Sequence, residues 1–267
     1  MSHRYRCPYC GDAPACNLMC YDEIERLVEF EGPDQVAAII TEPIQNAGGC
    51  IPPGSMDYFK KIRKLCDETG ILMIMDEVKT GFRIAKGGAG EYFGVKADLY
   101  TYAKSIANGY PLAAIGGSNE VMGVIAPGQV AQGGTYCGNA VGAAAASATL
   151  EILETTDALE TVEKRGKRLM QGMGEILTEA GVAHAILGHP SMFGLLLEPK
   201  VEKPREFRDV MGSNLELFEE VALQMLDMGV DIELDPREPF FMCEAHSEQD
   251  IDETLNKFND AVKKVKR

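Results

Sequence analysis

Lys104 is the side chain in this sequence best suited to covalent chemistry. It follows the segment 99–103, Leu-Tyr-Thr-Tyr-Ala, and is a lone cation in an apolar setting. Partial desolvation lowers the pKa of a lysine ammonium group toward the range in which the free amine attacks a carbonyl carbon and forms a Schiff base. Many lysines that follow strands are simply solvated, so this residue alone leaves both interpretations open.

Asp76 and Glu77 form a second candidate site, because these adjacent carboxylates directly follow the apolar run 71–75. Taking a carboxylate out of water costs several kcal/mol unless a cationic or hydrogen-bonding group meets it. We therefore expect at least one of the two to face a positive ligand or side chain. The alternative is a pair that caps a helix or forms an ion pair where the strand ends.

A glycine-rich segment precedes an alanine-rich run that predicts a helix over 140–153. The segment contains Gly133, Gly134 and Thr135, followed by Gly138 and Asn139. Exposed backbone N–H groups, a hydroxyl and a helix N-terminus together suit a phosphate group. The alternative is a tight packing turn, which is a common role of glycine at the start of a helix.

The eight cysteines fall into two groups. Four lie near the start, with two, five and three residues between them: Cys7, Cys10, Cys16 and Cys20. This spacing raises the alternative of a zinc-binding module over 7–20, but the middle gap is short for a zinc ribbon, so we expect no metal. The other four lie in apolar or glycine-rich contexts, which predicts reduced, buried thiols and a cytoplasmic protein: Cys50, Cys66, Cys137 and Cys243.

The elements that must position these residues follow an α/β pattern in the first part of the chain. Apolar runs at 36–40 and 71–75 predict strands buried on both faces, with an amphipathic helix over 56–68 between them. A strand–helix–strand unit places its strands parallel, so their carboxyl ends share the sheet edge where ligands usually bind. We also predict a helix over 21–30, an irregular loop over 81–94, and strands over 98–103 and 112–115.

The pattern changes to α+β after a long amphipathic helix predicted over 157–180. Short strands are predicted over 183–187, 192–197, 230–234 and 240–243, with helices near 205–228 and 249–264. We therefore divide the chain into a parallel-sheet domain over 1–155 and a smaller domain over 156–267.

Composition limits the partners. The 267 residues are 45% hydrophobic and 25% charged, which is typical of a globular protein with a sizeable core. With 26 basic and 41 acidic residues, the net charge of −15 disfavours nucleic acid and anionic membrane surfaces as partners. No stretch approaches the length of about 18 apolar residues that a membrane span needs, so neither a span nor a signal peptide is expected.

The candidate site residues and the motifs around them, taken in the order of the sequence, resemble those of class III aminotransferases, which are pyridoxal-phosphate enzymes of fold type I. The resemblance is greatest to the branch that contains glutamate-1-semialdehyde aminomutase. The resemblance runs from about Cys7 to the C-terminus. It is strongest in Asp-Glu-Val-Lys-Thr-Gly-Phe-Arg at 76–83, and continues through 87–95, 98–99, Lys104, 109–111, 116–117 and the Gly-Thr-Tyr-Cys-Gly-Asn block at 134–139. The resemblance is extended by Glu-Pro-Ile-Gln at 42–45 and by the block at 245–252, which reads Ala-His-Ser, two unmatched residues, then Asp-Ile-Asp.

The resemblance implies a role for each matched residue. Lys104 forms the Schiff base with pyridoxal 5′-phosphate and moves protons, while Asp76 holds the protonated pyridine nitrogen. Val78 packs on one face of the ring. Gly134 and Thr135 contact the cofactor phosphate of the other subunit of a homodimer. Glu42 is expected near the floor of the active site, in a supporting role.

The implied fold is α/β: part of a mostly parallel-sheet large domain of fold type I, plus a smaller α+β C-terminal domain. The implied function is transamination between a small-molecule amino donor and a carbonyl acceptor, or an aminomutase reaction, in a homodimer with its active site at the subunit interface. Compared with the family, the sequence begins part-way through the large domain, so the glycine-rich phosphate loop and a ring-stacking aromatic residue are expected to be absent.

Two alternatives follow from that comparison. The chain is either an enzyme of this kind, or a catalytically silent truncated homologue or subunit of a split enzyme that dimerises with a partner chain. Arg237 lies where some relatives bind a substrate carboxylate, but Asp235 and Glu238 are close enough in sequence to pair with it. For Arg237 we expect the surface ion pair.

Overall fold

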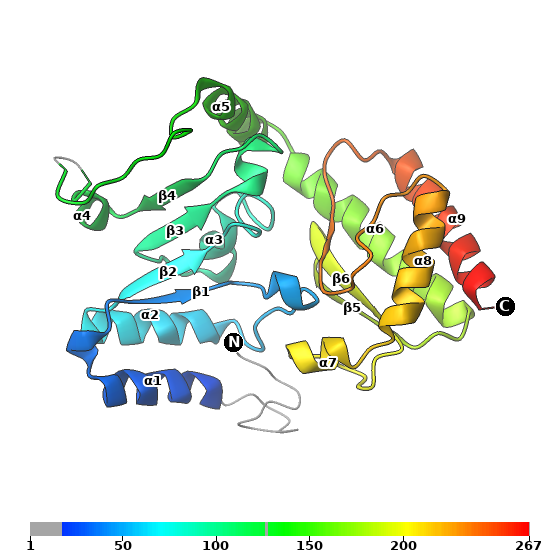
Figure 1. Cartoon of the computed structure of the whole chain (residues 1–267), viewed down its shortest axis with the longest axis horizontal. Helices are drawn as coiled ribbons and strands as arrows, with labels where there is room; N and C mark the ends of the chain where they lie inside the picture. Colours follow the sequence, from blue (N-terminus) through cyan, green and yellow to red (C-terminus); the bar gives the residue numbers. More distant parts are fainter. Residues whose placement is uncertain (1–17, 126–127, 267) are drawn as a thin grey trace. The chain divides into compact units, whose positions relative to one another are not determined.

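The computed structural model describes residues 18–125 and 128–266, whose backbone forms two compact units (Figure 1). Unit 1 consists of residues 18–43 and Pro53–Asp157. Unit 2 consists of Ile44–Pro52 and the described residues from Ala158 onward.

Unit 1 is built on a four-stranded sheet in the order β1-β2-β3-β4. The strands are β1 (Ala38–Thr41), β2 (Leu72–Asp76), β3 (Leu99–Tyr102) and β4 (Ala114–Gly117). The pairs β1–β2 and β2–β3 are parallel, and β4 runs antiparallel to β3. The predicted mostly parallel sheet is therefore confirmed.

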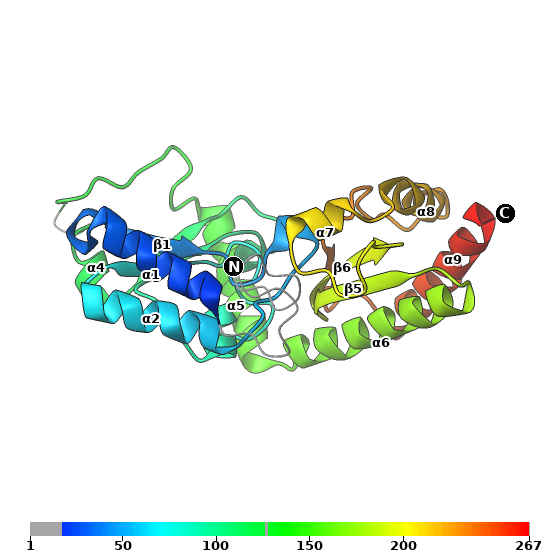
Figure 2. The same ribbon diagram turned by 90° about the horizontal axis from the view of Figure 1, so that it is seen from below.

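The crossover between β1 and β2 is the amphipathic helix α2 (Asp57–Thr69). Its Phe59 and Ile62 are 1% and 0% exposed, and Gly70 ends the helix in the left-handed region with φ 74°. Helix α1 (Met19–Glu31) contacts α2, and Figure 2 shows the two helices side by side. The predicted strand–helix–strand unit is therefore present.

The segment over 81–94 is only partly irregular, so the predicted loop is wrong at its end. Turns continue to Gly87, and α3 (Gly88–Phe93) follows. Phe93 is buried, and its ring centroid lies 4.9 Å from that of Phe59 on α2. This contact stabilises the short helix. A helix of six residues is too short to show a periodic apolar pattern in the sequence, so packing of this kind could not be predicted.

The remaining elements of unit 1 are η1 (Pro33–Gln35), η3 (Lys104–Ala107), α4 (Asn119–Met122) and α5 (Ala140–Thr155). Asn139 caps α5, because its Oδ1 accepts a hydrogen bond from the Gly142 amide at 2.7 Å. Ala146 of α5 packs in one cluster with Ile106 and Ala107 of η3. Helix α5 therefore supports the segment that begins at Lys104.

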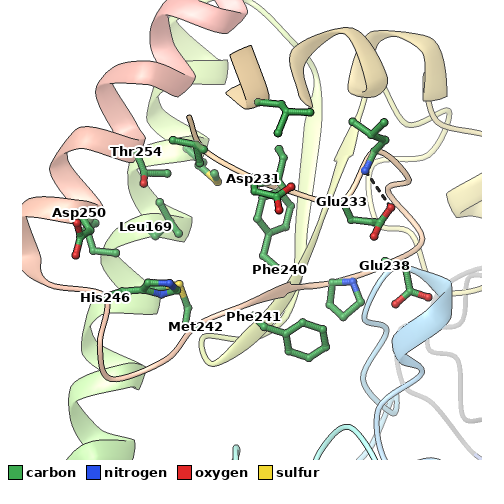
Figure 3. A pocket seen from close by; sticks show the side chains of 17 residues that line it. Leu169, Asp231, Glu233, Glu238, Phe240, Phe241, Met242, His246, Asp250 and Thr254 are labelled. Atoms are coloured by element: carbon green, nitrogen blue, oxygen red, sulfur yellow. Dashed lines mark hydrogen bonds between the residues drawn. The ribbon is translucent and has the colours of Figure 1, made fainter. Parts of the chain in front are cut away.

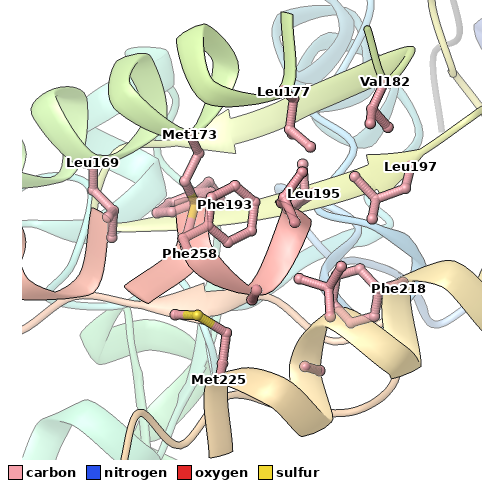
Figure 4. Close-up of a cluster of buried hydrophobic side chains, with 14 of the residues drawn as sticks. Leu169, Met173, Leu177, Val182, Phe193, Leu195, Leu197, Phe218, Met225 and Phe258 are labelled. Atoms are coloured by element: carbon pink, nitrogen blue, oxygen red, sulfur yellow. The ribbon is translucent and has the colours of Figure 1, made fainter. Parts of the chain in front are cut away.

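Unit 2 has the predicted α+β composition. Its sheet is antiparallel and has three strands: β5 (His184–His189), β6 (Met192–Leu197) and β7 (Phe240–Phe241). Its helices are η2 (Asn46–Gly48), α6 (Ala158–Glu179), α7 (Phe207–Met211), α8 (Leu215–Asp227) and α9 (Glu248–Val265). Figure 4 shows its core, where Met173 of α6, Phe193 of β6 and Phe258 of α9, all 0% exposed, lie near Phe218 of α8.

Residues 230–234 form no strand, so that prediction is wrong. The Val230 amide donates to the Met225 carbonyl at 2.9 Å, which closes the end of α8 instead of starting a sheet ladder. Val230 and Ile232 still pack against the core of unit 2. The alternating apolar pattern therefore predicts their contact with the core correctly, but no strand in the described part of the chain pairs with them.

Candidate active site

The edge of the unit 1 sheet collects three of the predicted site residues. Because β1, β2 and β3 are parallel, their carboxyl ends meet there. Glu42 directly follows β1, Asp76 ends β2, and Lys104 comes two residues after β3. Asp76 is in register with Thr101 on β3, so the chain after Thr101 passes close to this carboxylate before it reaches Lys104.

Glu77 is a structural carboxylate. It is 0% exposed and accepts hydrogen bonds from the amides of Ala89 at 2.6 Å and Gly90 at 3.1 Å, and from the Thr80 hydroxyl at 3.2 Å. Desolvation nevertheless raises its pKa, although all three bonds act to lower it. A Cβ on Gly88 would overlap the Glu77 carboxylate, so glycine is required there. The helix-capping alternative therefore holds for Glu77.

Asp76 is placed differently, because side chains alternate along a strand. It lies on the face opposite Met73 and Met75, and is half-buried. Its Oδ1 accepts from the Val78 amide and from the Thr101 hydroxyl, each at 3.1 Å. Among the described residues, nothing donates a hydrogen bond to Oδ2. The carboxylate is thus oriented through one oxygen while the other is available to a ligand.

Lys104 begins η3 with a left-handed backbone, φ 50°, which is uncommon for any residue other than glycine. Its side chain is exposed and makes no hydrogen bond or ion pair with another residue that the structure describes. Backbone strain of this kind gathers at functional sites, where the surrounding structure has to hold it. The amine is therefore available, on a backbone that is held in an unusual conformation.

Ser105 helps to keep the backbone at Lys104 in this conformation. Its hydroxyl donates to the Gly81 carbonyl at 2.6 Å, which ties the Lys104 segment to the loop that follows Asp76. A Cβ on Gly81 would lie 2.7 Å from the Tyr102 ring and 2.8 Å from the Glu77 carbonyl, so the two segments approach closely only because position 81 is glycine. We did not predict Thr101 or Ser105 as site residues, because strand register and loop contacts leave no local sequence signal.

Gly134 and Thr135 lie in the exposed segment before α5. The Cys137 amide donates to the Gly134 carbonyl at 3.0 Å in a turn, and within the described chain the Thr135 hydroxyl has no hydrogen-bond partner. Asn139, at the end of the segment, donates through Nδ2 to the Pro111 carbonyl at 3.3 Å. None of the described contacts joins Gly134 or Thr135 to Asp76 or Lys104.

The other sequence candidates have simple outcomes. Arg237 forms an exposed ion pair with Asp235, with Nε 2.8 Å from Oδ1 and 2.7 Å from Oδ2, so the expected surface pair is confirmed. Cys50 and Cys66 are buried, but Cys137 and Cys243 are exposed, so burial was predicted wrongly for those two. Both lie in segments outside helices and strands, where apolar neighbours in sequence do not enclose a side chain.

The zinc alternative falls mainly on Cys7, Cys10 and Cys16, which lie outside the described residues, while Cys20 is buried in α1. Within residues 18–125 and 128–266, no cluster of histidine, cysteine or carboxylate side chains could hold a metal ion. The helices over the same ranges include none that is both long and apolar enough to cross a membrane.

A sequence profile of the family described as Aminotransferase class-III matches residues 3–262. The chain belongs to this family. Among similar class III proteins are the glutamate-1-semialdehyde 2,1-aminomutases of Methanopyrus kandleri, 34% identical, and Aquifex aeolicus, 36% identical, each aligned over 93% of this chain and 58% of the relative. A solved omega-transaminase from Sphaerobacter thermophilus is 27% identical with a TM-score of 0.82, over 92% of this chain and 56% of that one.

These comparisons confirm the class III resemblance and the fold type I architecture. They also show that the chain spans about 58% of the length of the curated relatives it matches. The cofactor of class III aminotransferases is pyridoxal 5′-phosphate (PLP), and one similar solved structure is a transaminase with PLP bound. Two features of this chain fit PLP: the carboxylate oxygen of Asp76 that no described residue engages, and the amine of Lys104 after the neighbouring strand.

Proposed function

We propose that the chain catalyses PLP-dependent transfer of an amino group between a small-molecule amino donor and a keto acid or aldehyde, or moves an amino group within one molecule as an aminomutase does. The observation that carries the proposal is the shared sheet edge at which Asp76 presents Oδ2 and Lys104 follows the adjacent parallel strand. A carboxylate and an amine in this relation can hold the two ends of a pyridine aldehyde.

The chemistry divides between cofactor and protein. Bound PLP supplies an electron sink that stabilises negative charge at the substrate carbon bearing the amino group. Asp76 keeps a proton on the pyridine nitrogen, because its negative charge favours the protonated ring. Lys104 would hold the cofactor covalently through Nζ, and once a substrate amine had taken its place, the released lysine amine would carry protons to and from the substrate carbon. Thr101 orients Asp76 through the hydrogen bond to Oδ1.

The remaining predicted site residues complete the proposal. Val78 begins the turn two residues after Asp76 and packs on one face of the ring. Glu42 supports the floor of the site from the end of β1. Gly134 and Thr135 bind the cofactor phosphate of a second subunit, which agrees with their exposure and with the Thr135 hydroxyl having no described partner.

Helix α5 supports a homodimer with the active site at the subunit interface. The helix is alanine-rich and strongly apolar, yet only Gly142 and Ala146 are buried. Val141 and Ile152 are 63% and 53% exposed, and Tyr136, just before the helix, is 80% exposed. Apolar surface of this extent commonly marks a protein interface. Cys66 is a buried thiol outside any disulfide, which agrees with a reducing, cytoplasmic setting.

The second candidate is a catalytically silent subunit that pairs with a partner chain. One face of the unit 1 sheet favours it: Ile40, in register with Ile74, is 63% exposed, and Ile115 on β4 is 51% exposed. Apolar residues of a parallel sheet are normally covered on both faces. A separate chain that covers this face would supply the remaining groups of the site.

Absorbance spectroscopy with added PLP tests the two candidates. The purified chain should develop the visible band of lysine-bound cofactor, and borohydride should remove it. Lys104→Ala should lack the band, whereas Lys64→Ala, which removes an exposed lysine from α2, should keep it. An equal band in Lys104→Ala would disprove the role of Lys104. A band that forms only when a partner chain is co-purified would favour the second candidate.

A further inference from the structure

Unit 2 contains a cavity of about 590 Å³ that the proposed transamination does not use. Its floor consists of core side chains from α6, α9 and the strand end: Leu169, Met173, Met242 and Ile251, all at most 5% exposed. The volume lies within the range typical of small-molecule sites, and a mostly apolar lining is typical as well. Every lining residue belongs to unit 2.

The other wall is the segment over 230–241 that was predicted partly as a strand. Residues 230–239 lie outside the sheet, whereas Phe240 and Phe241 form β7 and pair with β6; Val230, Ile232 and Phe240 are among the lining side chains. Figure 3 shows Phe240 near the middle of the cavity, and its ring stacks on Phe193 with centroids 5.1 Å apart. The wall therefore has a fixed aromatic face, and a second ring, that of Phe241, also lines the cavity.

The described charged residues that line the cavity are acidic, with one histidine beside them. Asp231, Glu233, Glu238 and Asp250 line the cavity, and His246 lies beside Asp250 in Figure 3; within residues 18–125 and 128–266, neither lysine nor arginine lines it. Two hydrogen bonds from Ser247 to Asp250, at 2.7 and 2.8 Å, lower the pKa of Asp250 and so favour its charged form. The nearby Arg237 is paired with Asp235 and does not line the cavity.

The carboxylates are distributed along the cavity. In Figure 3, Asp250 lies at one end, Glu233 and Glu238 lie at the other, and Asp231 lies between. They do not converge as metal ligands, since no three such groups in the described chain could share an ion. A single compact cation therefore fits poorly, and an anion is repelled at every point.

We propose that this cavity binds an aliphatic diamine, with one ammonium group at the Asp250 end, the other at the Glu233 end, and the hydrocarbon chain on the apolar floor. The acidic lining favours a cationic ligand, and carboxylates at both ends of the cavity favour a ligand with two positive charges. The apolar floor favours a hydrocarbon chain between those charges. The proposal stands independently of the transamination chemistry, because no residue of unit 1 contributes to it.

Isothermal titration of the intact chain with cadaverine tests this site. Pentylamine, pentanediol and glutarate provide the monoamine, uncharged and dianionic compounds of the same chain length. We expect saturable binding of cadaverine that weakens with added salt, weaker binding of pentylamine, and no binding of glutarate or pentanediol. Absence of saturable cadaverine binding, or equal binding of glutarate, would overturn the proposal.

Two double variants with the same change of charge separate the cavity from the general acidity of the protein. Asp231→Asn with Glu233→Gln alters exposed cavity carboxylates, and should weaken cadaverine binding about tenfold. Glu219→Gln with Glu220→Gln alters exposed carboxylates of α8 outside the cavity, and should leave the affinity within about twofold. Equal losses in both would show that binding is nonspecific and would refute the site.

Discussion

Asp76 and Glu77 are adjacent in sequence but face opposite sides of the sheet, and this gives them different chemistry. Glu77 is enclosed by amides and a hydroxyl that use both of its oxygens. Asp76 has one oxygen engaged, by Thr101 and Val78, and the other without a partner among the described residues. Only Asp76 can meet a ligand while keeping a fixed orientation.

A substitution at Asp76 should therefore affect catalysis more than folding. Asp76→Asn retains an oxygen for the Val78 and Thr101 donors but removes the charge, and should lower kcat about 100-fold or more. The measurement is steady-state kinetics with an accepted amine donor, together with a thermal melt of the cofactor-free chain, which should change little.

Thr101→Val is the matched control, because it removes a donor to Asp76 without changing any charge. The loss of one hydrogen bond should cost roughly tenfold or less in kcat. If Asp76→Asn is no more impaired than Thr101→Val, the carboxylate charge does not contribute and the role given to Asp76 is wrong.

At the scale of elements, a second carboxylate fixes the strands on which the site depends. Asp98, just before β3, accepts from the Met73 amide of β2 and from Nη1 of Arg63 on α2, each at 2.7 Å. This contact joins a helix and two strands at the sheet edge opposite Asp76 and Lys104, the proposed site residues. It helps to hold the register that places Thr101 beside Asp76.

The Asp98 contact predicts a loss of stability in acid. Burial raises the pKa of Asp98, but the Met73 amide and Arg63 outweigh that effect and leave the pKa below its usual value. A carboxyl with a depressed folded-state pKa stabilises the fold above its unfolded pKa of about 3.9, and this contribution disappears as the pH falls through the folded value. Urea unfolding between neutral and acidic pH should show the decline, and Asp98→Asn should reduce it.

Glu77 should change stability with pH in the opposite direction to Asp98, because its pKa is raised. Its raised pKa means that its contribution to stability is greatest below its unfolded pKa and is lost as the pH rises through the folded value. Glu77→Gln should therefore flatten the stability profile on the side above about pH 4.3. A Glu77→Gln profile that instead lost the decline in acid would contradict the assignment of the two carboxylates.

The sequence predicted the elements better than it predicted their contacts. Periodicity was sufficient to locate β1, α2 and β2, because a short apolar run and a helical apolar stripe leave clear patterns. The predicted burial of β1 on both faces is wrong, since Ile40 is 63% exposed. The same reasoning failed at 230–234, where alternation reports contact with the core but a strand also needs a neighbour. Thr101 and Ser105 could not be predicted, because their partners, Asp76 and Gly81, are 25 and 24 residues away in sequence.

The family resemblance supplied what local patterns did not. From residue types alone, the solvated-lysine alternative for Lys104 and the capping alternative for the carboxylate pair both stayed open. The ordered blocks between residues 42 and 139 selected Asp76 and Lys104, and the parallel pairing of β2 and β3 then gave a physical reason for the pair to act together. The phosphate role of Gly134 and Thr135 stays a prediction.

At the scale of the whole molecule, the exposed apolar surface of α5 predicts self-association. Val141 is 63% exposed on this helix, so Val141→Lys should place a charge in the proposed dimer interface and shift the chain toward the monomer. Sedimentation velocity measures the change. Leu223→Lys on α8, where the leucine is 41% exposed, is the control and should leave the dimer intact.

A dimer that persists in Val141→Lys and dissociates in Leu223→Lys would place the interface in unit 2 instead. A chain that is monomeric before any substitution would contradict the homodimer proposal and strengthen the case for a separate partner. Both outcomes can be distinguished without catalytic activity.

The most direct test of the central claim is to find which lysine the cofactor occupies. The chain is incubated with PLP, reduced with borohydride and digested, and the peptides are mapped by mass spectrometry. We expect a stable pyridoxyl group on Lys104, reduced in amount by Asp76→Asn. A label spread over exposed lysines such as Lys64 in proportion to their accessibility, with none concentrated at Lys104, would contradict it.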